Sequence, residues 1–404
     1  MRMRSFSPAV PPYKLNGSQS MNLKSGLLGI AIALFSLSGA ARAAAPDPPA
    51  IDGHSYGLMD YQSCEIIAGQ NLDAHVPPAS ITKVMTVYVA FDMIKQGRLK
   101  LSDTALVSQK AWAEGKDSSE SRMFLTLGSR VTIEDLLRGI IIVSGNDASV
   151  ALAEHIAGSE DAFSQIMNQY AQKLGMANTH FVDASGMPND QHYTSAHDLL
   201  ILAHALIQNF PDDYKYFSEH EFKYGIEHPQ QNRNGLLFKD PTVDGIKTGH
   251  TEAAGYCLLA SAKRDGRRLI SVVMGGQSWA YREQANQELL NYGFRNFDTA
   301  SVLGAAAPVQ SMRVYKGADT EVGVGTLDPV YLALPAGEKS QLQVQPQISG
   351  KLIAPLTAGQ KVGEATILLA GKPLKTVPLV ALKDVPAGGF WHRLVDQIKL
   401  WLGL

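Results

Sequence analysis

The sequence predicts an α+β protein: a first domain whose sheet is covered by helices, then a small all-β domain and a C-terminal amphipathic helix. Three observations support this. In the first part, segments whose apolar residues recur with a helical period lie between strand-like runs. Short β-like runs separated by Pro and Gly follow. In the tail, the apolar residues again recur with a helical period. The predicted segments are 1–43 (leader and signal peptide), 44–297, 298–386 and 387–404.

The first predicted domain opens with a β-hairpin, because residues 55–73, SYGLMDYQSCEIIAGQNLD, alternate around a Ser63-Cys64 turn. A first helix then ends at Gly97. Four further helical stretches carry capping signals, namely TIEDLLRGIIIVSG, NDASVALAEHIAG, SEDAFSQIMNQYAQKLG and SAHDLLILAHALIQN. Two apolar runs around the turn 264–266 predict paired strands, and a last helix closes the domain near residue 297.

The β-like region has no cluster of His, Cys or acidic residues, so it predicts a spacer or docking domain and not a reaction centre. The tail beyond it has about 15 helical residues, too few to span a bilayer, but an amphipathic helix with two tryptophans can lie in the interface. The alternative is a helix that docks onto its own protein. The apolar positions share one helical face: Phe390, Trp391, Leu394, Val395, Ile398, Trp401 and Leu402.

The N-terminus predicts an exported protein. Lys24 precedes an apolar run over 27–37, and small residues follow at 41–43, which is the pattern of a secretory signal cleaved after about Ala43. The apolar run is too short for a transmembrane anchor. Because residues 1–20 lie upstream of this signal, we expect Met21 to be the true start.

Composition excludes several classes of protein. Apolar residues make up 45% and charged residues 18%, which is typical of a globular chain. A formal net charge of -2 gives no basis for nucleic-acid binding. The sequence has no HExxH or CxxC motif, so no metal site and no cofactor are predicted. The two cysteines, Cys64 and Cys257, are expected to be free and buried.

Ser80 and Lys83, in PPASITK, lie three residues apart at the start of the first helix. Residues at this spacing share a helix face, so the Lys83 amine can reach Ser80 Oγ. Pro77 and Pro78 should make the entry extended, which places Ser80 near the helix N-terminus, where the dipole favours an oxyanion. Lys83 can act as a base near neutral pH only if its pKa is lowered, at a cost of ~4 kcal/mol. The alternative is a helix cap and a solvated lysine.

Two more short motifs contain polar residues at element ends. The first is VSGNDAS, a helix break that contains Ser144, Gly145 and Asn146. Gly145 should allow a sharp turn. The Ser144 hydroxyl could relay a proton, and the Asn146 amide could hold a substrate carbonyl. Alone, this is also a good capping turn.

Lys247, Thr248 and Gly249 end an apolar strand. Lys247 and Thr248 can bind a carboxylate, and Gly249 leaves room for a substrate backbone. The N–H of His250 is a candidate oxyanion donor, whereas its imidazole is expected to be orienting or structural. The alternative for this segment is a surface hairpin.

Together the three motifs stand in the order of a joint signature, S-x-x-K, S-D-N and K-T-G, shared by penicillin-binding proteins and class A β-lactamases. The chain resembles the low-molecular-mass penicillin-binding proteins that are D-alanyl-D-alanine carboxypeptidases, which have Ser-Gly-Asn as the middle motif. The resemblance covers 55–297, and the family's β-rich domain and amphipathic anchor match 298–404. It implies a β-lactamase/transpeptidase-like catalytic domain, in which an antiparallel sheet is flanked by helices and joined to a helical subdomain. The matching segments are PASITK, SGNDAS, AGSEDAF, NTHF, NRNGLL, VDGIKTGHT and LISVVMGG.

The resemblance implies that the penultimate D-Ala carbonyl of a peptidoglycan pentapeptide acylates Ser80, that terminal D-Ala leaves, and that water hydrolyses the acyl-enzyme. Lys83 would be the base, and Ser144 and Lys247 would relay protons. The backbone N–H groups of Ser80 and His250 would form the oxyanion hole. β-Lactam antibiotics would be covalent inhibitors. The implied substrate-binding residues are Asn146 (amide), Thr248 (terminal carboxylate), Lys247, Gly249 and His250.

Three further residues match family positions. Arg282, in AYREQA, corresponds to an arginine near the carboxylate site, although Tyr-Arg-Glu departs from the usual Gly-Arg-Glu. Arg233 and Asp198 either form a supporting ion pair or touch substrate, and Asp198 also fits a helix cap.

Alternatives of the same fold are a DD-endopeptidase and a weak β-lactamase, and a different class is a catalytically weak cell-shape or binding protein. The stretch NTHFVDASGMPNDQHYTSAHD contains no glutamate that could serve β-lactam hydrolysis, so slow deacylation of penicillin is expected. The expected location is the periplasmic face of the inner membrane, with peripheral anchoring by the C-terminal helix. The oligomeric state is left open, with a homodimer as one option.

Overall fold

The computed structural model describes residues 45–114 and 120–403, and the predicted signal segment and its Met21 start lie outside this part. Within it, the predicted hairpin, helices, paired strands, all-β region and C-terminal helix all form. The order of these elements is that of the predicted α+β architecture. None of the described helices is both long enough and apolar enough to cross a membrane.

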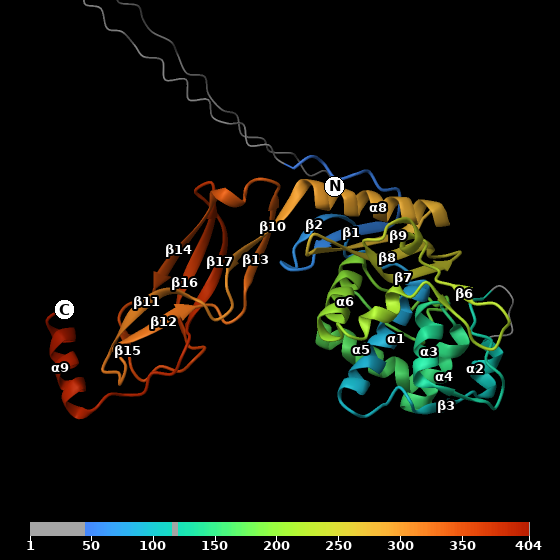
Figure 1. Cartoon of the computed structure of the whole chain (residues 1–404), viewed down its shortest axis with the longest axis horizontal. Helices are drawn as coiled ribbons and strands as arrows, with labels where there is room; N and C mark the ends of the chain where they lie inside the picture. Colours follow the sequence, from blue (N-terminus) through green and yellow to red (C-terminus); the bar gives the residue numbers. More distant parts are fainter. Residues whose placement is uncertain (1–44, 115–119, 404) are drawn as a thin grey trace, which may run out of the picture. The chain divides into compact units, whose positions relative to one another are not determined.

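The catalytic region is built on a five-stranded antiparallel sheet in the order β2-β1-β9-β8-β7. Helix α8 (Trp279–Asn296) covers one face of this sheet and α6 (Ala196–Asn209) packs on the other (Figure 1). Because both faces are covered, the central strands are apolar over most of their length. The strands are β1 (Ser55–Asp60), β2 (Ile66–Gln70), β7 (Val243–Thr251), β8 (Gly255–Arg264) and β9 (Arg267–Gly276).

A helical subdomain lies beside the sheet and contains most of the buried core (Figure 1). Its central helix α1 is buried on nearly all sides, which explains why most of its residues are apolar. Predicted caps form: the Thr132 and Ser195 hydroxyls accept hydrogen bonds from the N–H groups of Asp135 and Asp198. The elements are η1 (Ala79–Thr82), α1 (Lys83–Lys95), β3 (Thr104–Leu106), α2 (Gln109–Glu114), β4 (Arg130–Thr132), α3 (Ile133–Ile141), α4 (Asn146–Ala157), α5 (Glu160–Leu174), η2 (Tyr214–Ser218), β5 (Glu221–Phe222), β6 (Gln230–Gln231) and α7 (Leu236–Lys239).

The region after α8 is all-β, with its own hydrophobic core. A six-stranded sheet has the order β14-β16-β17-β12-β11-β15, and β10 pairs with β13. Short strands separated by Pro and Gly turns form this region, as the sequence predicts. The elements are β10 (Phe297–Leu303), β11 (Pro308–Tyr315), β12 (Glu321–Gly325), β13 (Val330–Pro335), η3 (Lys339–Gln341), β14 (Leu342–Ile348), β15 (Leu352–Ile353), β16 (Lys361–Leu369) and β17 (Lys372–Ala381).

The C-terminal helix α9 (Phe390–Trp401) contacts the β region through its polar side. Asp396 is buried, accepts a hydrogen bond from the Lys316 N–H at 2.5 Å and lies 3.5 Å from Arg313 Nη2. The apolar side stays open, with Trp391 75% and Trp401 84% exposed. The helix therefore docks onto its own protein and still presents its apolar face.

The prediction for the cysteines is half right. Cys64 and Cys257 are both free, and Cys257 is buried, but Cys64 is exposed. Cys64 occupies the turn between β1 and β2 with a left-handed φ of 59°. Its thiol lies 3.2 Å from His204 Nε2 on the surface side of α6. A turn position explains the exposure, because a tight hairpin turn leaves no layer of chain to cover it.

Candidate active site

Ser80 lies in the 3₁₀ helix η1, immediately before α1 begins at Lys83. Pro78 already has helical dihedrals (φ -75°, ψ -22°), so the expected extended entry is wrong at this residue. The turn of the chain is made instead by Ala79, whose φ is 48°. Lys83 Nζ lies 2.8 Å from Ser80 Oγ, which is the contact that the spacing predicts.

Lys83 is fully buried and has three hydrogen-bond partners. Besides Ser80 Oγ, its amine contacts Asn146 Oδ1 at 2.8 Å and the Ser185 carbonyl oxygen at 2.7 Å. Burial lowers the pKa of Lys83 to about 7, against the opposing effect of nearby carboxylates, of which Asp183 is the strongest. A large fraction of Lys83 is therefore a neutral amine near neutral pH.

The break between α3 and α4 places Ser144 and Asn146 beside this pair. Ser144, and not Gly145, has the left-handed backbone, with a φ of 62°. Gly145 has an ordinary φ of -59°, so the expected reason for this glycine is wrong. A Cβ at Gly145 would lie 2.9 Å from Asp147 Oδ1 and 3.1 Å from the Met123 nitrogen. Glycine is needed there because the neighbouring chain is too close for a side chain.

Lys247 forms the second lysine–serine pair of the site. Its Nζ donates to Ser144 Oγ at 2.9 Å and to the Thr248 carbonyl at 3.1 Å. Burial lowers the pKa of Lys247 well below its usual value, and the positive charges of Lys83 and Arg282 lower it further. Two buried lysines, each bonded to a serine hydroxyl, thus lie close enough to influence one another.

Asn146 is held at both ends of its amide. Its Oδ1 accepts from Lys83 Nζ, and its Nδ2 donates to Glu120 Oε2 at 3.0 Å. Because an ionised carboxylate can only accept hydrogen bonds, Glu120 fixes which end of the amide faces Lys83. The sequence had suggested only a substrate contact for Asn146. Its described contacts also make it a support for Lys83.

The end of β7 packs directly on the nucleophile segment. A Cβ at Gly249 would lie 2.9 Å from the Pro78 carbonyl oxygen and 3.2 Å from Ala79 Cβ. Gly249 is therefore required for contact with η1, and not only for room beside a substrate as predicted. The imidazole of His250 stacks on Tyr256 with ring centroids 4.1 Å apart, which suits the orienting or structural role expected for it.

Arg282, at the start of α8, is buried beneath the same edge of the sheet. Its Nη1 donates to the Gly249 carbonyl at 3.0 Å, and its guanidinium lies 4.7 Å from the Trp279 ring centroid. Its Nε and Nη2 are buried without a hydrogen-bond partner among the described residues. Burial lowers the pKa of Arg282 to about 10, so it remains positively charged near neutral pH.

The suggested ion pair between Arg233 and Asp198 is wrong. Arg233 Nη2 contacts Gln230 Oε1 at 3.3 Å. Asp198 lies at the start of α6, where its carboxylate accepts from the Asn178 N–H and the Thr179 hydroxyl. In the described part of the chain, residues 45–114 and 120–403, no ion pair joins Arg233 to Asp198. Ser195 and not Asp198 caps α6, and the Asp198 carboxylate ties residues 178–179 to the start of that helix, whereas Arg233 reaches the wall of the cleft.

These residues surround a cleft of about 560 Å³. Lys83 and Lys247 lie behind its wall, bonded to Ser80 and Ser144. The predicted residues that line it are Ser80, Ser144, Asn146, Arg233, Thr248, Gly249, His250 and Arg282. Sequence reasoning missed other lining residues, which have no motif of their own: Glu120, Ser121, Ser185, Gly186, Met187, Pro188, Thr251, Glu252 and Trp279.

Comparison with known proteins tests the resemblance. A family model described as D-alanyl-D-alanine carboxypeptidase matches residues 42–278. The relative D-alanyl-D-alanine carboxypeptidase DacA of Escherichia coli (strain K12) is 42% identical over 367 residues, which are 89% of this chain and 91% of the relative. The chain belongs to the D-alanyl-D-alanine carboxypeptidase family. The predicted family and enzyme class are confirmed.

Other comparisons extend this D-alanyl-D-alanine carboxypeptidase assignment. A second family model, the C-terminal domain of penicillin-binding protein 5, matches residues 297–387. D-alanyl-D-alanine carboxypeptidase DacF of Bacillus subtilis (strain 168) is 32% identical, covering 85% of this chain and 88% of the relative. The structure of penicillin-binding protein 5 from Haemophilus influenzae superposes with a TM-score of 0.81 at 40% identity, covering 84% of this chain and 99% of that one. The predicted fold class is confirmed.

Proposed function

We propose that this D-alanyl-D-alanine carboxypeptidase uses Ser80 as its nucleophile and neutral Lys83 as the base. Lys83 takes the Ser80 proton as Oγ attacks the carbonyl of the penultimate D-Ala of a pentapeptide stem. The N–H groups of Ser80 and His250 stabilise the oxyanion, each typically by ~3 kcal/mol. The C–N bond then breaks, the leaving nitrogen takes up that one proton so that terminal D-Ala departs with a neutral amino group, and water hydrolyses the ester and returns a proton to Ser80 Oγ.

The observation that carries this proposal is the buried Lys83 amine at 2.8 Å from Ser80 Oγ, with its pKa lowered to about 7 by burial. A lysine with an ordinary pKa would be protonated near neutral pH and could not take a proton. Ser144 and Lys247 then pass a proton to the leaving amine, a role supported by the 2.9 Å hydrogen bond from Lys247 Nζ to Ser144 Oγ. The proton that Lys83 removes from Ser80 thus leaves with D-Ala.

Product analysis separates this activity from the endopeptidase alternative. We expect purified enzyme to release D-Ala from a muropeptide ending in D-Ala-D-Ala much faster than it cleaves a cross-linked muropeptide dimer. Free D-Ala is measured by an oxidase-coupled assay and the dimer by chromatography. Faster cleavage of the dimer would assign the enzyme to cross-link hydrolysis.

We also propose that Thr248 and Arg282 receive the terminal carboxylate of the substrate. The supporting observation is the Arg282 guanidinium, which lines the cleft with two nitrogens buried and without a described partner. A buried donor without a partner is costly, and a carboxylate from the ligand would supply one.

Replacing Arg282 with glutamine should raise KM for an acyl-D-Ala-D-Ala substrate about 10- to 100-fold, because a charge-assisted hydrogen bond is lost. The same peptide with a C-terminal carboxamide is the control, and wild type and variant should hydrolyse it at similar rates. Steady-state kinetics on both peptides give the result. An equal loss on both peptides would mean that Arg282 only supports the Gly249 segment.

β-Lactams are the proposed covalent inhibitors. A related protein, penicillin-binding protein D2 of Listeria monocytogenes, has been solved in an ampicillin-bound form, with a TM-score of 0.56 at 26% identity, covering 62% of this chain and 100% of that one. A β-lactam carbonyl is attacked in the same way as the peptide carbonyl, but its ring nitrogen stays attached and does not leave the site. Ser80 should therefore stay acylated for longer than with the peptide.

We propose that the mature enzyme is exported and rests on the periplasmic face of the inner membrane through α9. The supporting observation is that the two sides of α9 differ. Buried Asp396 ties the polar side of the helix to the β region, and the apolar side of the helix is exposed. A rigidly held apolar face with two exposed tryptophans is suited to a lipid interface.

Deleting residues 387–404 should abolish binding to phosphatidylglycerol-containing vesicles in a flotation assay. A full-length variant with Trp391 and Trp401 both changed to serine should bind about 10-fold more weakly or worse, because two apolar side chains no longer enter the interface. D-Ala release in solution should be unchanged in both proteins. Unaltered flotation of the deletion protein would refute the anchor.

A further inference from the structure

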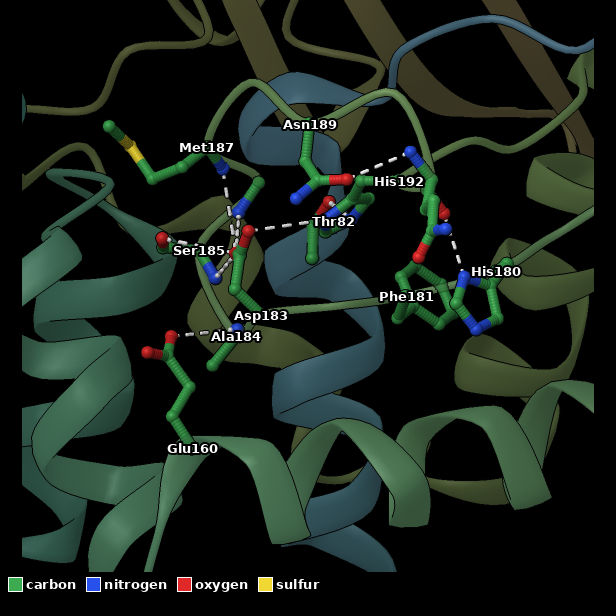
Figure 2. Close-up of polar contacts among 12 residues, drawn as sticks. Thr82, Glu160, His180, Phe181, Asp183, Ala184, Ser185, Met187, Asn189 and His192 are labelled. Carbon is green, nitrogen blue, oxygen red and sulfur yellow. Dashed lines mark hydrogen bonds and ion pairs between the residues drawn. The ribbon is translucent and has the colours of Figure 1, made fainter.

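A hydrogen-bonded network behind the cleft surrounds the carboxylate of Asp183, which lies at the centre of Figure 2. Asp183 Oδ1 accepts from the N–H groups of Ser185 at 2.7 Å and Gly186 at 2.6 Å. Its Oδ2 lies 3.2 Å from His192 Nδ1, and His192 Nε2 lies 2.9 Å from Thr82 Oγ1. The network thus joins the 183–187 turn to the helix turn that holds Ser80.

The turn is pressed against the nucleophile segment. Gly186 has a φ of 90°, and a Cβ there would lie 1.8 Å from the Ala79 carbonyl oxygen and 2.8 Å from Thr82 Oγ1. Only glycine permits this approach. At this closeness the Ser185 carbonyl oxygen reaches Lys83 Nζ at 2.7 Å. Asp183 therefore determines where one partner of the base is placed.

The identity of the three partners of Lys83 decides where a neutral amine points its lone pair. An ammonium group donates three hydrogen bonds, whereas a neutral amine donates two and accepts one. The Ser185 carbonyl and Asn146 Oδ1 can only accept, so they take both N–H groups. Ser80 Oγ carries a proton and can donate it, so the lone pair is left facing Ser80. Loss of either acceptor would free the amine to rotate.

We propose that Asp183 and His192 are positioning residues for acylation: they hold the Ser185 carbonyl on Lys83 and thereby direct the amine lone pair at Ser80. Neither residue touches the substrate. The inference rests on the proposed role of Lys83 as base. Thr82 completes the link, because its hydroxyl bonds to His192 one residue before Lys83 in the helix.

The charge of Asp183 adds a measurable consequence. Burial alone would raise the pKa of Asp183, but His192 and the backbone N–H groups lower it to about 2, so it is ionised throughout the working range. Its negative charge favours protonated Lys83 and opposes burial. The other charged or titratable groups near Lys83 are Glu120, Asp147 and Glu114 on the acidic side, and Lys247 and His192 on the basic side.

Asp183→Asn tests the charge while keeping the fold of the turn, because an amide oxygen can still accept from the Ser185 and Gly186 N–H groups. The second-order rate constant for acylation by a chromogenic β-lactam is measured against pH. In wild type it should rise with pH as Lys83 loses its proton. In the variant this rise should move to lower pH, by about half to one pH unit, because a carboxylate that favours the ammonium is gone.

Glu160→Gln is the matched control. Glu160 also holds this loop, since its Oε1 accepts from the Ala184 N–H at 3.0 Å (Figure 2). Its Oε2, however, is paired with Lys110 at 2.8 Å. Its pH profile should coincide with wild type. An unmoved profile in Asp183→Asn, or an equal shift in Glu160→Gln, would overturn the role of the Asp183 charge.

Substitutions of His192 test whether its hydrogen bonds position the Lys83 amine. His192→Phe keeps a ring beside Phe181, whose centroid lies 5.7 Å from that of the imidazole, but loses both hydrogen bonds. The rate constant of the acylation step should fall about 10- to 100-fold with the pre-covalent binding constant unchanged, because the amine is no longer aimed. His192→Gln, whose amide can reach both neighbours, should recover part of the rate.

The outcomes distinguish this inference from the catalytic proposal on which it rests. If wild type shows no rise of acylation with pH through the neutral range, Lys83 is not the base. If that rise is present but His192→Phe acylates at the wild-type rate, only the positioning role fails. Circular dichroism and thermal melting establish that each variant is folded, and a folded His192→Phe with weakened binding and an unchanged acylation step would also refute positioning.

Discussion

Ser80→Ala should lose D-Ala release by on the order of 10⁴-fold or more and should form no covalent complex with penicillin, because it removes the hydroxyl that is bonded to the base Lys83. Ser144 is another hydroxyl of the cleft, but its described bond is to Lys247 and not to Lys83. Oxidase-coupled measurement of D-Ala and labelling with a fluorescent penicillin give the result.

Ser121→Ala is the matched control for this loss. Ser121 lines the same cleft, but its described contact is through the backbone, whose carbonyl accepts from the Asn146 N–H at 2.9 Å. The variant should keep nearly full activity. Comparable losses in Ser80→Ala and Ser121→Ala would point to a general disturbance of the cleft and not to a nucleophile.

Lys83→Met should slow acylation by about 10²- to 10⁴-fold, which is the usual contribution of a positioned base. Methionine fills the buried space without a titratable group, so the rise of the rate with pH that belongs to Lys83 should also disappear. Lys95→Met, at the far end of the same helix, is the control and should behave as wild type. A variant that retains the wild-type pH profile would exclude Lys83 as the base.

The same substitution has a stability signature. Lys83 is protonated in the unfolded chain up to its ordinary pKa of 10.5 but only up to about pH 7 in the folded protein. Below about pH 7 Lys83 is charged in both states, and burying that charge destabilises the folded state by about 5 kcal/mol. This cost disappears as pH rises towards 10.5. The free energy of unfolding, measured by urea denaturation, should therefore rise between pH 7 and 10 in wild type relative to Lys83→Met. A constant difference would mean that Lys83 is not buried as a neutral amine.

Local features of the fold follow from the sequence because they depend on neighbouring residues. The Thr132 and Ser195 caps and the turn before Gly266 have chain-local causes, and each forms as predicted. For Gly145 the predicted reason is wrong, and for Gly249 it is incomplete. Their need for glycine comes from Met123 and Pro78, which approach from distant parts of the chain.

The same division applies to the active site. The three motifs could be found because their residues lie within a few positions of one another and combine in a characteristic order. Glu120 and Asp183 could not, because a single acidic residue in a loop carries no local signal. Their importance arises only when folding brings them to Asn146 and to the Ser185 turn. Supporting residues of this kind are visible only in three dimensions.

The most direct test of the central claim is to identify the residue that carries the acyl group. Purified enzyme is treated with penicillin, quenched in acid, digested and analysed by tandem mass spectrometry. We expect one penicilloyl adduct per chain, on Ser80, absent from Ser80→Ala and slowed in formation by Lys83→Met. An adduct on Ser144 or any other residue, or a labelled Ser80→Ala protein, would contradict it.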